Sequence, residues 1–237
     1  MKNATKHAAT LKSLHKKLCR QHKPGDRPQL DPLRALVLGV LQEACDDGRA
    51  HKAAAALDEE FVDVNELRVA TELELTNLIG PGYPAAMDRA VRLREILMHL
   101  FDGEGRLTID RVAAMNKKEQ RAHLRAVPAM TPFIEGYVSL LGFGQAAMPV
   151  DEAMRRYLAG QGVLEADATL EDAQKFLESN LKADEYWPFF ACCRAESCKP
   201  RSRGRTGEAK AKKTSKKAAK ATTRTGTRRA SGRKQSA

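Results

Sequence analysis

From residue 31 to about residue 192 the chain consists of short amphipathic segments, and no strand-like alternation continues for more than a few residues. Segment 32–44 shows the pattern clearly, because one face of its helix is lined by Leu33, Leu36, Val37, Val40 and Leu41. Asp31 can cap this helix, and Pro32 fits its first turn. The sequence therefore predicts an all-α protein.

Capping signals divide the rest of this region into further helices. Thr71–Glu74 has the capping-box pattern, Asn116–Glu119 repeats it, and Thr169–Asp172 opens another helix. We expect helices over about 4–22, 84–101, 131–142, 151–159, 169–180 and 182–192. No repeat period is present, which argues against a solenoid.

Charge is distributed unevenly within the formal total of +11. Residues 199–237 hold 15 basic residues and one acidic residue, and residues 1–28 hold 8 basic residues and one acidic residue. The intervening body, 29–198, holds 18 basic and 28 acidic residues. A DNA duplex should therefore be attracted by the two ends of the chain and not by its body.

The C-terminal tail, 199–237, has no aliphatic residue larger than alanine after Pro200. Such a segment cannot bury enough apolar area to fold alone, so we expect disorder. Its composition resembles histone-like tails, which bind phosphates without reading sequence. The alternative is a tail that only confers solubility. The expected DNA-backbone contacts are Arg201, Arg203, Arg205, Lys210, Lys212, Lys213, Lys216, Lys217, Lys220, Arg224, Arg228, Arg229, Arg233 and Lys234.

Location follows from what the chain lacks. No apolar run approaches the ~18 residues of a membrane span, and the first residues contain no apolar signal segment. We expect a cytoplasmic monomer without membrane contact, associated with the nucleoid if the source is bacterial. In that compartment the five cysteines should not form structural disulfides.

The order of these helices resembles the endonuclease III family, the helix-hairpin-helix base-excision DNA glycosylases. The residues that carry the resemblance are DPLRALVLGVLQEAC at 31–45, Leu78-Ile79-Gly80, Gly82-Tyr83 before a long helix, and segment 127–158. The resemblance spans about 31–198. It implies an α-helical fold of two lobes with a DNA cleft between them, into which a damaged nucleotide is flipped.

The same resemblance suggests the domain boundaries. Residues 1–30 would form a basic N-terminal helix that packs with the second lobe, and residues 31–143 a six-helix lobe with a degenerate hairpin. Residues 144–198 would form the second lobe, followed by the tail at 199–237.

The hairpin position is occupied by Val127, Pro128, Ala129, Met130, Thr131 and Pro132. The two glycines of the family become Ala129 and Thr131, which resist positive φ, and Pro132 has no amide to donate. Anion binding by this loop should be weak or absent, and a plain helix start at Thr131 is the simpler interpretation. Phe133 stands where the family has its lysine, which excludes Schiff-base lyase chemistry there.

Asp151 falls on the position of the family's catalytic aspartate, which steadies a cationic sugar or activates water. It is equally an ordinary helix N-cap. Gln42 matches a family glutamine near the space left by the flipped base, or lies on the polar side of its helix. The aromatic run 186–190 could stack on bases but is more typical of a helix docked on the core.

Many members of the family hold a [4Fe–4S] cluster on four cysteines near the C-terminus. This chain has only Cys192, Cys193 and Cys198 there, so we expect no cluster and no other cofactor. Zinc is a weak alternative because no histidine lies near these cysteines.

Three functional hypotheses remain. The first is a monofunctional glycosylase that uses Asp151 to excise a damaged base. The second, which the missing glycines, Phe133 and the missing cysteines favour, is a catalytically degenerate DNA-associated protein held on double-stranded DNA mainly by its tail, with a protein partner left open. The third is an all-α protein-binding module, which the tail argues against.

Overall fold

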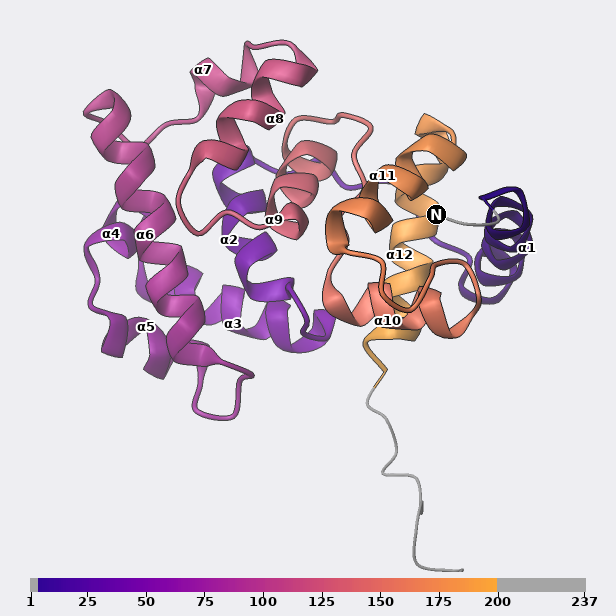
Figure 1. The fold of residues 1–237 in the computed structure, drawn as a ribbon. Coiled ribbons are helices and arrows are strands. Elements are labelled where there is room, and N and C mark those ends of the chain that lie inside the picture. Colours follow the sequence, from indigo (N-terminus) through magenta and orange to yellow (C-terminus); the bar gives the residue numbers. More distant parts are fainter. Residues whose placement is uncertain (1–3, 200–237) are drawn as a thin grey trace, which may run out of the picture. The chain divides into compact units, whose positions relative to one another are not determined.

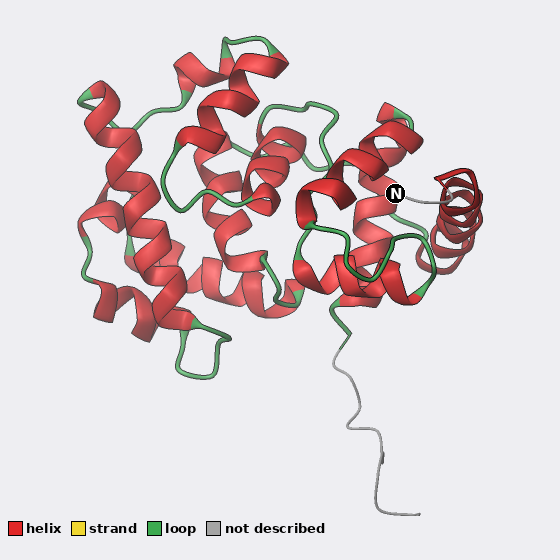
Figure 2. Ribbon diagram, viewed as in Figure 1, coloured by secondary structure: helices red, strands yellow, loops and turns green. Residues whose placement is uncertain are grey.

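The computed structural model describes residues 4–199, and every regular element within them is a helix (Figures 1 and 2). This confirms the all-α prediction; the expected disorder of the tail concerns residues outside the described range. In chain order the helices are α1 (Ala4–His22), α2 (Pro32–Gln42), α3 (Asp47–Glu60), α4 (Val64–Val69), α5 (Glu72–Ile79), α6 (Ala86–Glu104), α7 (Asp110–Ala113), α8 (Lys117–Ala126), α9 (Pro132–Tyr137), α10 (Glu152–Gly160), α11 (Leu170–Asn180) and α12 (Tyr186–Ser197).

The expected caps are present. The Asp31 side chain accepts from the Arg34 amide at 3.0 Å, and Asn116 caps α8 at 3.1 Å from the Lys118 and Glu119 amides. Capping boxes begin α5 at Thr71 and α11 at Thr169. These local signals explain why the starts of these helices were predictable from sequence.

Other boundaries differ from the prediction. The helix expected over 131–142 is α9 followed by one π-helical turn, Val138–Gly142, in which the Phe143 amide bonds to the Val138 carbonyl at 3.0 Å. α12 begins at Tyr186 and continues to Ser197, five residues beyond the expected end. The alanine-rich α3 and the short α4 carry weak apolar periodicity, so the spacing did not reveal them.

α2 forms the centre of the fold. All eight residues from Ala35 to Gln42 are buried, and the helix packs against α3, α6, α9 and the π turn. Gly142 allows this packing, because a Cβ there would lie 3.0 Å from the Pro32 Cα. Helices from the first half of the chain and from the 132–142 segment therefore share a core with α2 as their common neighbour.

α1 packs against α12, far from α4 to α6 (Figure 1). Leu11, Leu14 and Leu18 form its buried face. Trp187 extends the contact by donating its indole N–H to the Gly25 carbonyl at 2.9 Å. Within residues 4–199, none of the helices combines the length and apolar character needed to cross a membrane.

Candidate functional site

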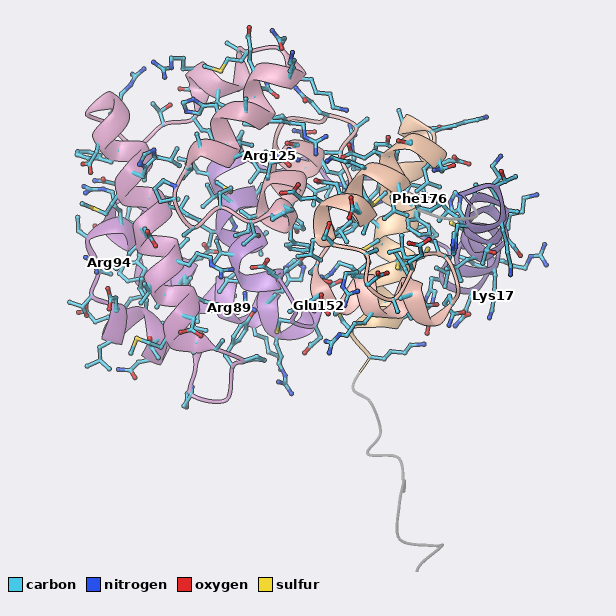
Figure 3. The ribbon with its side chains drawn as sticks, in the orientation of Figure 1. Lys17, Arg89, Arg94, Arg125, Glu152 and Phe176 are labelled. Atoms are coloured by element: carbon cyan, nitrogen blue, oxygen red, sulfur yellow. The ribbon has the colours of Figure 1, made fainter. Side chains whose placement is uncertain are left out.

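Asp151 precedes α10, which begins at Glu152 (Figure 3), and its side chain is only 1% exposed. One carboxylate oxygen accepts from the Met154 amide at 2.8 Å, as an N-cap does. The other accepts from the Ala44 amide at 2.9 Å and from an Arg194 Nη at 3.1 Å. As a catalytic aspartate or as an N-cap, Asp151 was expected at a helix start. The structure shows in addition that it is buried and accepts three hydrogen bonds.

Arg194 of α12 is the partner that the sequence analysis missed. Its side chain is 1% exposed and contacts two carboxylates, with Nη–Oδ distances of 3.1 Å to Asp151 and 2.9 Å to Asp47. It also donates to the carbonyls of Gln42, at 2.9 Å, and Cys45. Burial lowers the pKa of Arg194, but the charges of Asp47 and the other acidic groups outweigh that effect and the pKa is raised. Arg194 is therefore a buried cation whose guanidinium bonds to two carboxylates and two backbone carbonyls.

Phe133 fills the space beside this cation. It is fully buried, its ring lies 5.3 Å from the Arg194 guanidinium carbon, and it stacks on Tyr137 with ring centroids 5.9 Å apart. Phe190 of α12 lies 6.2 Å from Phe133 and closes the group. The aromatic run at 186–190 thus belongs largely to the core, as the sequence favoured.

Gln42 lies in the same neighbourhood and is 4% exposed. Arg194 connects it to Asp151, because one guanidinium bonds to the Gln42 carbonyl and to the Asp151 carboxylate. The structure therefore brings together three predicted positions, Gln42, Phe133 and Asp151, around Arg194. We call Asp151, Arg194, Asp47 and Phe133 the Asp151 cluster.

The hairpin loop connects α8 to α9 and corrects one expectation. Ala129 has φ of +61°, the left-handed conformation that glycine adopts without strain, although alanine was expected to resist it. Thr131 has a negative φ of −102° and caps α9 by accepting from the Ile134 amide at 3.2 Å. A left-handed turn therefore forms at an alanine, between the buried Val127 and the capped start of α9.

A second buried carboxylate lies on α9 behind the hairpin. Glu135 is fully buried and pairs with Arg121 at 2.8 Å and Arg125 at 3.2 Å. Arg125 continues to Gln174 of α11 at 3.1 Å. The adjacent Gly136 is required by close packing, since a Cβ there would lie 2.9 Å from the Pro149 backbone. These contacts hold α8 and α9 against the chain that follows residue 147.

The cysteines at the end of the chain do not fit a four-thiolate cluster. Burial raises the pKa of Cys192 to about 12, and it also raises the pKa of Cys193 and of Cys198, which disfavours the thiolates that bind metal. Cys192 faces Cys19 of α1, with the two sulfurs 4.0 Å apart. Among residues 4–199, no three His, Cys, Asp or Glu side chains are grouped as metal ligands. The absence of an iron-sulfur cluster remains a prediction.

One signal in the sequence could have revealed Arg194. It follows a buried run of Phe189, Phe190, Cys192 and Cys193 on one short helix, and an arginine four residues after Phe190 lies on the same face. A cation on a buried face needs carboxylate partners. Those partners could not be identified, because Asp47 lies 147 residues earlier in the chain.

No protein-family model matches the chain, and no curated protein matches it either. Several solved structures do match the chain. A trapped endonuclease III–DNA covalent intermediate superposes with a TM-score of 0.64 at 16% identity, covering 79% of this chain and 84% of that one. The 8-oxoguanine glycosylase/lyase of Clostridium acetobutylicum, bound to double-stranded DNA, gives 0.64 at 16% identity and covers 82% and 70%. The 3-methyladenine DNA glycosylase of H. pylori gives 0.59 at 14% identity and covers 81% and 95%.

These likenesses extend over about four fifths of the chain and confirm the expected fold. The chain has the helical fold of the helix-hairpin-helix DNA glycosylases. At 14–16% identity the likeness establishes the fold alone.

Proposed function

We propose that this chain, with the fold of DNA repair glycosylases, is a DNA-associated protein that does not excise bases through Asp151. The observation that carries the proposal is the state of that carboxylate: 1% exposed, bonded to two backbone amides and paired with Arg194. A group that activates water or steadies a sugar cation must reach the reacting atoms. Here the Asp151 carboxylate is buried and already has a cationic partner in Arg194.

Phe133 supports the same proposal from the other side of the cluster. It is fully buried against Tyr137 and Phe190, where the resemblance would place an attacking lysine. A phenyl ring can neither attack a sugar carbon nor hold a proton for one. The space beside Asp151 is thus filled by packed rings and a paired cation.

Association with DNA rests on the fold and on charge. The proteins whose fold it shares include two solved in complex with DNA, one of them with double-stranded DNA. The tail, which lies outside the described residues, carries the densest positive charge in the sequence. We propose that it binds duplex backbone without reading sequence, so that affinity falls steeply with salt.

The test of the missing chemistry uses the full chain and duplexes that each contain one uracil, 8-oxoguanine or 3-methyladenine. We expect no base release, scored by strand cleavage at each abasic site in alkali. Asp151→Asn, which keeps a capping side chain, and Glu152→Gln, at the exposed neighbour, are the matched variants. Base release by the wild type that is lost in Asp151→Asn and kept in Glu152→Gln would establish the alternative, an active monofunctional glycosylase.

The test of DNA association measures binding to intact duplex and to duplex with one abasic-site analogue, over a range of salt. We expect equal affinity for the two duplexes. A chain ending at Lys199 should bind more weakly and lose most of the slope of log K against log salt, about 0.9 for each lost phosphate contact. A preference for the abasic duplex would show that the fold still recognises a missing base, and an unchanged slope would remove the role of the tail.

A further inference from the structure

The outer face of α1 carries an uninterrupted row of cations. Lys12, Lys16 and Arg20 recur every four residues and so lie on one line along the helix, with Lys17 beside them; all four are exposed. Figure 3 labels Lys17 on α1. We call these four residues the α1 cationic stripe. The first acidic residue of the chain is Asp26, beyond the end of α1, so no carboxylate on this helix neutralises the stripe.

The inner side of α1 has a different chemistry. Leu11 and Leu18 are buried against the core. Two histidines contact the nearby carboxylates, with nitrogen–oxygen distances of 3.7 Å from His15 to Glu185 and 2.6 Å from His22 to Glu196. Among residues 4–199, no carboxylate lies within ion-pair distance of a stripe cation. The lysines and the arginine of α1 thus remain unneutralised although the body as a whole is acidic.

The geometry of the stripe fits a polyanion. The rise of 1.5 Å per residue spaces successive cations by ~6 Å and gives Lys12 to Arg20 a length of ~12 Å. A duplex offers one negative charge per ~1.7 Å of its axis, so several phosphates can face the stripe at once. A membrane surface is a poorer fit, because the apolar face that would insert into lipid is already buried in the protein.

We propose that the α1 cationic stripe is a docking surface for the phosphate backbone of duplex DNA. The inference rests on the proposed association with DNA and adds a defined contact within residues 4–199. Four cations fixed on one helix present a contact of set spacing, and so α1 orients the folded unit on the duplex. The stripe offers no side chain suited to reading base edges, and it therefore adds affinity without sequence preference.

The test compares two charge-matched double variants of the full chain. Lys12→Gln/Lys16→Gln removes two stripe cations, and Lys118→Gln/Lys175→Gln removes two exposed lysines from α8 and α11. Glutamine keeps the helix propensity of lysine. Binding to a 30-base-pair duplex is measured over a range of salt, and thermal unfolding confirms that both variants are folded.

We expect the stripe variant to lower the slope of log K against log salt by up to about 1.8, the value for two phosphate contacts, and the control variant to lower it far less. Equal slopes for the two variants, with tight binding by the wild type, would overturn the stripe and leave the proposed function standing. Failure of the wild-type chain to bind the duplex would overturn both proposals. If the stripe variant binds DNA as the wild type does but no longer binds an acidic peptide, the surface belongs to a protein partner instead.

Discussion

The Asp151 cluster and the α1 cationic stripe use charge in opposite ways. In the cluster, Arg194 and Asp151 are each 1% exposed and bonded to partners on several elements. In the stripe, every cation is exposed and none is paired within the described residues. Buried charges that are fully bonded hold a structure together, whereas exposed charges without partners remain available to a ligand. The residues at the position expected for catalysis thus have a structural role, and the surface that we propose for DNA binding lies on α1 instead.

The largest effect is expected from a variant that breaks the Asp151 cluster. Arg194→Met keeps much of the side-chain volume but leaves Asp151 buried without its cation. We expect unfolding free energy to fall by about 3–5 kcal/mol, measured by urea denaturation. Arg156→Met, which removes an exposed pair with Glu152 at 3.7 Å, is the control and should cost less than about 1 kcal/mol. Equal losses in the two variants would mean that the cluster contributes no more than a surface pair.

A smaller effect tests whether the hairpin is strained. Ala129→Gly relieves an alanine at φ of +61° and should raise unfolding free energy by about 0.5–1 kcal/mol, after the greater freedom of glycine in the unfolded chain is subtracted. Ala122→Gly, at an exposed position inside α8, should instead lower it by about 0.5–1 kcal/mol. If both variants are destabilised, the loop has no strain to relieve.

The smallest effect concerns the inner side of α1, where carboxylates are paired. The hydrogen bond from Lys199 and the contact with His22 hold the pKa of Glu196 below its ordinary value, with burial opposing them. A lowered folded pKa stabilises the protein above the unfolded pKa of ~4.3, and this stabilisation disappears as pH falls through the folded value. Glu196→Gln should therefore cost less than about 1 kcal/mol at pH 7 and almost nothing at pH 3.

The control for that variant is Glu60→Gln, at an exposed position at the end of α3. It should show no difference between the two pH values in urea denaturation. A loss for Glu196→Gln that stays constant from pH 7 to pH 3 would mean that the side chain acts by packing and not by charge.

The two regions also differ in how far the sequence predicts them. Caps such as Thr71 and Thr169, and the cations of α1, depend on neighbours within a few residues, so their pattern is visible in the sequence. The role of Arg194 depends on Asp47 and Asp151, which lie 147 and 43 residues away, and only the fold brings them together. The conformation of Ala129 was predicted wrongly for a related reason. The fold holds it at a positive φ, which the local preference of alanine opposes.

The position of Arg194 late in the chain, after its partners, also affects how the protein is made. During synthesis, Gln42, Asp47 and Asp151 leave the ribosome well before the arginine that bonds to them. A nascent or truncated chain that ends before residue 194 has an unpaired carboxylate in its centre and lacks the helix that covers it. A chain must therefore include residue 194 of α12 before Asp151 can be paired in the interior.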